Sequence, residues 1–126
     1  MSKEVIRMND IKLLMKKETV DGTYKKDGTR INREVGYAVG LVKGDGFTTF
    51  NVNEIMTKFL ATRVNYPNAE YIGIWTRKNG QMVFDPIAIY ENIKDAFKVA
   101  TRNRQDAIWD FKEGKEITLA KQNEKV

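Results

Sequence analysis

The densest chemistry in this chain lies between Trp75 and Trp109, where arginines, side-chain amides and aromatic rings are interspersed. An arginine guanidinium is a planar fork of donors that suits phosphate. Asparagine and glutamine amides can pair with a purine edge, and a ring that stacks on a base contributes roughly 1–3 kcal/mol. These residue types predict a pocket for a compact anionic nucleotide, although any domain surface contains them too. The candidate ligand-binding residues are Arg77, Phe84, Tyr90, Asn92, Arg102, Arg104 and Gln105.

The sequence offers little for catalysis. Cys and His are both absent, which removes thiol chemistry, the usual general base and the commonest metal ligand. No phosphate-cradling glycine motif and no metal-ligand spacing is present. Asp106 and Asp110 would share one face of a strand, but that spacing is more typical of a solvated face. We therefore expect no catalytic residues, no metal and no cofactor, and a binding protein rather than an enzyme.

Local patterns predict two helices. Asn53 is the expected N-cap of a helix that ends near Asn65, because Pro67 disfavours helical geometry just before it. Ile55, Met56, Phe59 and Leu60 recur at helical spacing and should face a sheet. Asn92 is the expected cap of a second helix, which closes over 101–105 with Arg102 and Arg104 at its negative end.

Turn signals place strands around these helices. Asn79-Gly80 favours a two-residue type I′ turn between strands 71–76 and 81–84, which would make Trp75 and Phe84 cross-strand neighbours. Such a pair is either core or a platform for a ligand; Trp75 and Trp109 are assigned mainly to the core. A second hairpin joins 36–42 to 47–52, Asp85-Pro86 ends a strand, and further strands follow at 106–111 and 116–119.

The N-terminal third is harder to interpret. Ile11, Leu13 and Met15 alternate with other residues as in a strand, and 23–34 is a polar stretch that forms either an exposed ribbon or a mobile loop. Residues 120–126 should fray. Taken together, the elements predict a single α+β domain over 1–126: a mainly antiparallel β-sheet with two α-helices packed on it.

Composition bounds the setting. The chain has 126 residues, 41% hydrophobic and 31% charged, which is typical of one soluble domain. The N-terminus is unlike a signal peptide and no apolar run could span a membrane, so we expect a cytosolic protein. The net charge of +5 is spread over residues 1–34, 35–70 and 71–126 as +3, 0 and +2. This even spread makes nucleic acid an unlikely partner, since such proteins usually concentrate their charge.

One family resemblance adds a function. The strand Ile72 to Trp75, the turn at Gly80, Phe84-Asp85, and the segment Arg104 to Asp110 together resemble phage-encoded Thoeris anti-defence proteins of the first type. The resemblance covers about residues 36–119. It implies a sponge that sequesters the cyclic ADP-ribose isomers made by bacterial TIR-domain enzymes. It also implies an antiparallel sheet and a dimer or larger homo-oligomer with pockets near the subunit interface, acting in the infected host's cytoplasm.

For such a ligand we assign roles by chemistry and location. Arg102 and Arg104 would neutralise the pyrophosphate, and Arg77 would be a further hydrogen-bond donor to phosphate. Asn92 and Gln105 would form hydrogen bonds with the base or the ribose. Phe84 or Tyr90 would stack on adenine. Two alternatives remain: a small basic phage protein that binds nucleic acid or inhibits a host nucleoprotein, as anti-CRISPR proteins do, and an interaction module that pairs with a protein through its sheet.

Overall fold

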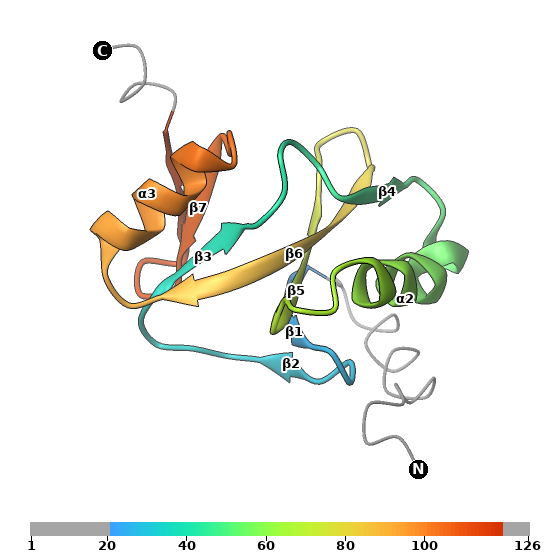
Figure 1. The fold of residues 1–126 in the computed structure, drawn as a ribbon. Helices are drawn as coiled ribbons and strands as arrows, with labels where there is room; N and C mark the ends of the chain where they lie inside the picture. Colours follow the sequence, from blue (N-terminus) through green and yellow to red (C-terminus); the bar gives the residue numbers. More distant parts are fainter. Residues whose placement is uncertain (1–20, 120–126) are drawn as a thin grey trace. The chain divides into compact units, whose positions relative to one another are not determined.

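The computed structural model describes residues 21–119. Across this range eight strands form one antiparallel sheet accompanied by two α-helices, which confirms the predicted α+β class (Figure 1). The sheet order is β2-β1-β5-β6-β3-β7-β8, and β4 also pairs with β6. The predicted strand over 11–15 and the predicted frayed tail lie outside the described residues. The elements are β1 (Gly22–Lys25), β2 (Arg30–Ile31), β3 (Tyr37–Gly40), β4 (Phe47–Thr49), η1 (Val52–Glu54), α2 (Ile55–Asn65), β5 (Tyr71–Thr76), β6 (Met82–Tyr90), α3 (Ile93–Arg102), β7 (Ala107–Asp110) and β8 (Lys115–Thr118).

The described chain divides into two compact units. The first contains residues 21–31 and 45–86, and the second contains 32–44 and 87–119. Strand β6 contributes to both, with residues 82–86 in the first unit and 87–90 in the second. Each unit has its own hydrophobic cluster, so each is described separately.

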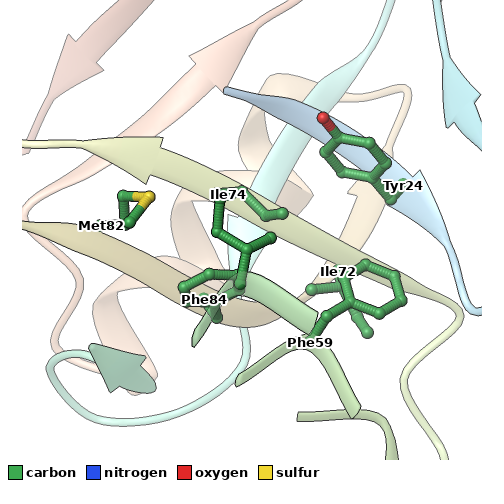
Figure 2. Packing of buried hydrophobic residues seen from close by; sticks show 7 residues of the cluster. Tyr24, Phe59, Ile72, Ile74, Met82 and Phe84 are labelled. Carbon is green, nitrogen blue, oxygen red and sulfur yellow. The ribbon is translucent and has the colours of Figure 1, made fainter. Parts of the chain in front are cut away.

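The first unit packs α2 against β4 and β5. Its cluster joins the apolar face of α2 to strands β1, β5 and β6 (Figure 2). Phe59 lies at its centre, fully buried, with its ring edge-on to Tyr24 at 6.0 Å between centroids. Full burial of such a ring contributes roughly 1.5–3 kcal/mol. The polar stretch after Asp21 forms a ribbon here, because β1 and β2 pair antiparallel.

Helix α2 begins differently from the prediction. Asn51 caps the short turn before it, η1, by accepting from the Asn53 N–H at 2.9 Å, and α2 itself follows Glu54 without a side-chain cap, so the prediction of Asn53 as the cap was wrong. A short 3₁₀ turn of this kind is common at helix starts. The helix ends at Asn65, two residues before Pro67, as predicted. Ile55 and Phe59 are buried, whereas the predicted core residue Leu60 is exposed.

The turn between β5 and β6 is one residue longer than predicted. The Arg77 N–H donates to Gln81 O at 2.8 Å, and the Gly80 N–H donates to Arg77 O at 2.9 Å. Gly80 has a φ of +92°, so the loop is a three-residue turn closed by a left-handed glycine, not a two-residue type I′ turn. Counting outward from Arg77 opposite Gln81 places Ile74 beside Phe84. A one-residue shift of this kind moves each side chain to the other face of its strand.

This shift reverses two sequence predictions. Phe84 is 0% exposed and belongs to the core cluster of the first unit, so its ring has no face for a ligand and the predicted stacking role is wrong. Trp75 is 38% exposed, so its assignment to the core and its pairing with Phe84 are also wrong. The pairing of β5 with β6 places Ile74 beside Phe84, where Trp75 was expected.

Strand β6 also continues past the predicted stop at Asp85-Pro86. Its first part pairs with β4, with Phe84 opposite Phe47, and its last part pairs with β3, with Ile87 opposite Gly40. Proline has no N–H to donate and is tolerated where a ladder is interrupted. Pro86 lies where the partner strand changes. The prediction that β3 and β4 pair with each other as a hairpin was therefore wrong.

The second unit packs α3 against β3 and β7. Its cluster includes Val39, Ala96, Ala100 and Ile108. Because Ile108 faces this cluster, the alternation of the strand turns the next residue, Trp109, to the other side, where it is 39% exposed. The prediction that Trp109 is a core residue was wrong for this reason.

The corrected place of Phe84 can be tested against a matched phenylalanine. We expect Phe84→Ala to lower the free energy of unfolding by about 3–5 kcal/mol, because it opens a cavity in a packed cluster. Phe50→Ala removes the same side chain at a position 62% exposed and should change it by less than about 0.5 kcal/mol. Urea unfolding of both variants measures the difference, and equal effects would contradict the described core.

Candidate functional site at the end of helix α3

Helix α3 ends in a well-defined capping motif. The Arg104 N–H donates to Thr101 O at 3.1 Å, and the Gln105 N–H donates to Ala100 O at 2.9 Å. These two bonds form a Schellman motif, in which the residue just beyond the cap, Arg104, takes the left-handed conformation. Arg104 has a φ of 53° and is the single residue other than glycine with positive φ within 21–119.

An arginine at this position is unfavourable for the backbone. Glycine is the usual occupant because its missing Cβ removes the clash with the following carbonyl. For any other L-residue, the left-handed conformation costs roughly 1–2 kcal/mol. Residues held in such conformations cluster at functional sites, so the observed outlier itself motivates a functional hypothesis. The charge of Arg104 is the property that a glycine here would lack.

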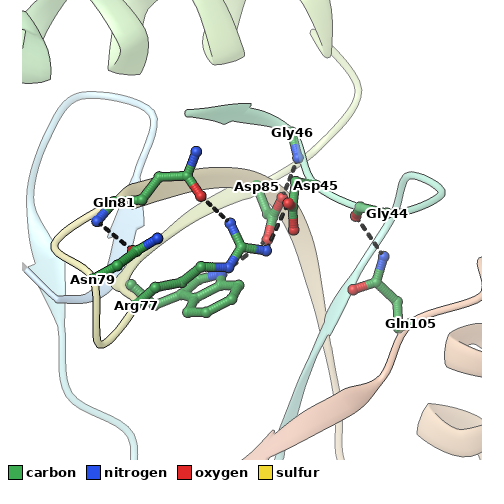
Figure 3. A network of polar contacts seen from close by, with 9 residues as sticks. Gly44, Asp45, Gly46, Arg77, Asn79, Gln81, Asp85 and Gln105 are labelled. Carbon is green, nitrogen blue, oxygen red and sulfur yellow. Dashed lines mark hydrogen bonds and ion pairs between the residues drawn. The ribbon is translucent and has the colours of Figure 1, made fainter. Parts of the chain in front are cut away.

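The side-chain amides on either side of Arg104 hold the end of β3 and the segment that follows it. Asn103 Nδ2 donates to Gly40 O at 3.1 Å. Gln105 Nε2 donates to Val42 O and, at 3.3 Å, to Gly44 O (Figure 3). A Cβ added to Gly40 would overlap the Gln105 amide, so the glycine lets that side chain lie against the strand. Both amide nitrogens donate to backbone carbonyls inside the protein, which makes Asn103 and Gln105 positioning residues.

Besides Gln105, the predicted ligand-binding residues of this unit fall into two groups. Tyr90 and Asn92 precede α3, and the Asn92 side chain caps the helix by accepting from the Lys94 N–H at 2.8 Å. Arg102 and Arg104 are exposed at the other end. Ten residues of helix separate the groups by about 15 Å. One chain therefore does not bring all four side chains around one compact ligand.

In the first unit, Arg77 belongs to a polar cluster rather than to an open site. Its guanidinium donates to Gln81 Oε1 and to Asp45 Oδ2, both at 2.6 Å, and lies 4.8 Å from the ring centre of Trp75 (Figure 3). Fixed between an amide, a carboxylate and an aromatic face, this guanidinium is engaged within the protein. The prediction that Arg77 contacts a phosphate gains no support from this arrangement.

Asp85 anchors the same cluster and was missed by the sequence reasoning. Its carboxylate accepts from the Gly46 N–H at 2.6 Å and from the Trp75 indole N–H at 3.2 Å. Burial raises the pKa of Asp85, and the nearby Asp45 carboxylate raises it further; the two hydrogen bonds and the Arg77 guanidinium act against this but do not cancel it. No pattern around Asp85-Pro86 signalled a buried carboxylate, because its partners are distant in sequence.

A surface hollow of about 310 Å³ lies elsewhere in the first unit. It is lined by Lys26, Leu60, Arg63, Val64 and Pro67, and Lys26 Nζ donates to Pro67 O. None of the predicted ligand-binding residues lines it.

Within residues 21–119 no group of acidic side chains is arranged to hold a metal ion. None of the helices described is long and apolar enough to cross a membrane.

Comparisons with protein-family models, curated proteins and solved structures gave no match. The resemblance to Thoeris anti-defence proteins therefore rests on the sequence pattern alone. The site with the strongest structural basis is the end of α3, where Arg102 and Arg104 extend from a backbone that hydrogen bonds hold in place.

The raised pKa of Asp85 gives a pH-dependent prediction. A folded-state pKa above the unfolded one means that the stability contributed by Asp85 is fully present below about pH 3.9 and is lost as the pH rises through the raised pKa. In the Asp85→Asn variant the side chain at position 85 stays neutral at every pH, so the variant does not lose stability in this way. We expect the free energy of unfolding of the wild type, minus that of the variant, to fall as the pH rises from 3.9 through this window.

Urea unfolding at a series of pH values measures this difference. An imperfect hydrogen bond from Trp75 to the new amide would shift the difference by a constant amount and leave its slope intact. Carboxylates remote from residue 85 cancel because both proteins contain them. A difference that is flat, or that grows with pH, would contradict the assigned cause.

Proposed function

We propose that this protein is a non-catalytic sponge that binds and sequesters a cyclic ADP-ribose isomer made by TIR-domain enzymes. It would act in the cytoplasm of a phage-infected bacterium and block immune signalling there. The ligand class comes from the resemblance to Thoeris anti-defence proteins. The observation that carries the site is Arg104, a charged residue at a left-handed position where glycine is usual, beside the exposed Arg102.

The chemistry of the pair suits a pyrophosphate. Two guanidinium groups offer forked donors to two phosphate groups, and each charge-assisted hydrogen bond contributes roughly 1.5–3 kcal/mol. The amides of Asn103 and Gln105 fix the backbone that holds Arg104. A preorganised site loses less conformational entropy on binding than a flexible one.

The arginines alone do not reach high affinity, which supports the proposal of a homo-oligomer. Nanomolar binding requires about 12 kcal/mol, and one strong bond from each arginine supplies about 3–6 kcal/mol. The rest must come from stacking and from exclusion of water. Since Tyr90 and Asn92 lie about 15 Å from the arginines along α3, we propose that a second copy of the chain completes the pocket.

A screen by thermal shift identifies the ligand. Cyclic ADP-ribose isomers, cyclic oligonucleotides and mononucleotides would be added in turn, since a ligand that binds only the folded state raises its stability by RT ln(1 + [L]/Kd). We expect the largest shift with a cyclic ADP-ribose isomer. Absence of a shift with every nucleotide would remove the sponge proposal. Light scattering on the same samples reports the proposed assembly.

The site is tested by the double variant Arg102→Ala/Arg104→Gly. Loss of two charge-assisted contacts should weaken ligand binding at least about a hundredfold by calorimetry. Stability should not fall, because glycine relieves the left-handed backbone of residue 104 by roughly 0.5–1 kcal/mol after its own entropy loss is subtracted. Unchanged ligand binding would exclude both arginines from the site.

A charge-matched control is Lys112→Gln/Lys115→Gln, which removes two exposed cations of the same unit, one from the turn between β7 and β8 and one from the first position of β8. It should bind the ligand as the wild type does. An equal loss in this control would show that overall charge, rather than the end of α3, determines binding.

A further inference from the structure

A row of cations follows the outer surface of α3. Lys94, Lys98 and Arg102 are spaced four residues apart and are all exposed. Residues four apart lie one above another on a helix, about 6 Å apart along its axis, so the row extends over about 12 Å. Arg104 lies just beyond its end and is exposed too. We call Lys94, Lys98, Arg102 and Arg104 the α3 cation row.

The row lies opposite the buried face of the helix. Ala96 and Ala100 are fully buried in the core cluster of the second unit. At 100° per residue, their mean direction is about 180° from that of Lys94, Lys98 and Arg102. The apolar face is thus already packed inside the protein and is not free to enter a lipid surface, so the row meets its partner through charge.

The four cations of the row are unpaired in the part of the chain that the structure describes. Within residues 21–119 none of its four side chains has an ion pair or hydrogen bond. Glu91, just before the helix, pairs with Arg33 at 3.9 Å, and Asp95 in the first turn is the one acidic residue on α3. Like charges four residues apart on a helix destabilise it by roughly 0.2–0.5 kcal/mol per pair. A bound polyanion would remove this repulsion.

We propose that the α3 cation row binds the phosphate backbone of nucleic acid without regard to base sequence. A regular line of cations matches a regular line of phosphates, and phosphate contacts carry no base information. The exposed face of α3 presents no aromatic ring on which a base could stack. The even spread of charge along the sequence concealed this feature, because the helical repeat brings the four cations to one face.

This binding goes beyond the proposed sponge function and is separable from it. Arg102 and Arg104 belong to both sites, whereas Lys94 and Lys98 belong to the row alone. A cyclic nucleotide bound at the end of α3 would therefore compete with nucleic acid. Lys94→Gln/Lys98→Gln tests the row and leaves the arginines of the sponge site in place.

The test is a salt titration of binding to a fluorescently labelled oligothymidine, followed by anisotropy. Each phosphate neutralised on a single strand contributes about −0.7 to the slope of log K against log salt concentration. Four cations give a slope of about −2.8, which is an affinity loss of about 20-fold for a threefold rise in salt. Lys94→Gln/Lys98→Gln should reduce the slope to about −1.4. A DNA duplex arm should give about −3.6 for the wild type.

The control Lys112→Gln/Lys115→Gln carries the same net charge as the row variant and should keep the wild-type slope. Equal slopes for the two variants, no binding at low salt, or equally tight binding of polyglutamate would each overturn the proposal. Circular dichroism checks that both variants remain folded. Lys94→Gln/Lys98→Gln should leave cyclic-nucleotide binding unchanged. Loss of cyclic-nucleotide binding in this variant would place both lysines in the sponge site and overturn the proposal that the row is a separate site.

Discussion

The hydrogen bonds from Asn103 and Gln105 to the end of β3 and the backbone just after it are the interactions on which the candidate site depends. They join the end of α3 to carbonyls of Gly40, Val42 and Gly44, more than sixty residues earlier in the chain. Gly40 is needed because a larger residue would overlap the Gln105 amide. The helix end is therefore fixed at three backbone positions, and Arg104 is held between its two anchors.

The same arrangement explains why an arginine occupies an unfavourable backbone position. The Schellman bonds and the flanking amides over-determine the conformation of residue 104, so the left-handed strain of roughly 1–2 kcal/mol is tolerated. Glycine would satisfy the backbone and lose the charge. Together with Arg102 and the lysines of α3, Arg104 gives this helix a positive surface that its unit does not neutralise internally. Both proposed ligands are anions for this reason.

The sequence predicted what depends on neighbouring residues. The fold class, the helix that Asn92 caps and the helix end before Pro67 follow from local periodicity, capping and steric rules. What depends on distant partners was not predictable. One extra residue in the turn before Gln81 put Trp75 and Phe84 on opposite faces instead of one, and the Asp85 carboxylate accepts from Gly46 and Trp75, which lie far from it in the sequence. For the site, the types Arg and Gln were identified, but only the structure shows that the Gln105 amide donates to the backbone carbonyls of Val42 and Gly44.

Amide chemical-shift mapping by NMR would show whether the end of α3 binds the anionic ligand. On addition of the cyclic ADP-ribose isomer that gives the largest thermal shift, we expect the greatest changes at the backbone amides of residues 101–106. The amides of residues 41–44, whose carbonyls the flanking side chains hold, should follow. The greatest changes at the Trp75 indole and the hairpin around Gly80, with 101–106 unmoved, would contradict binding at the end of α3.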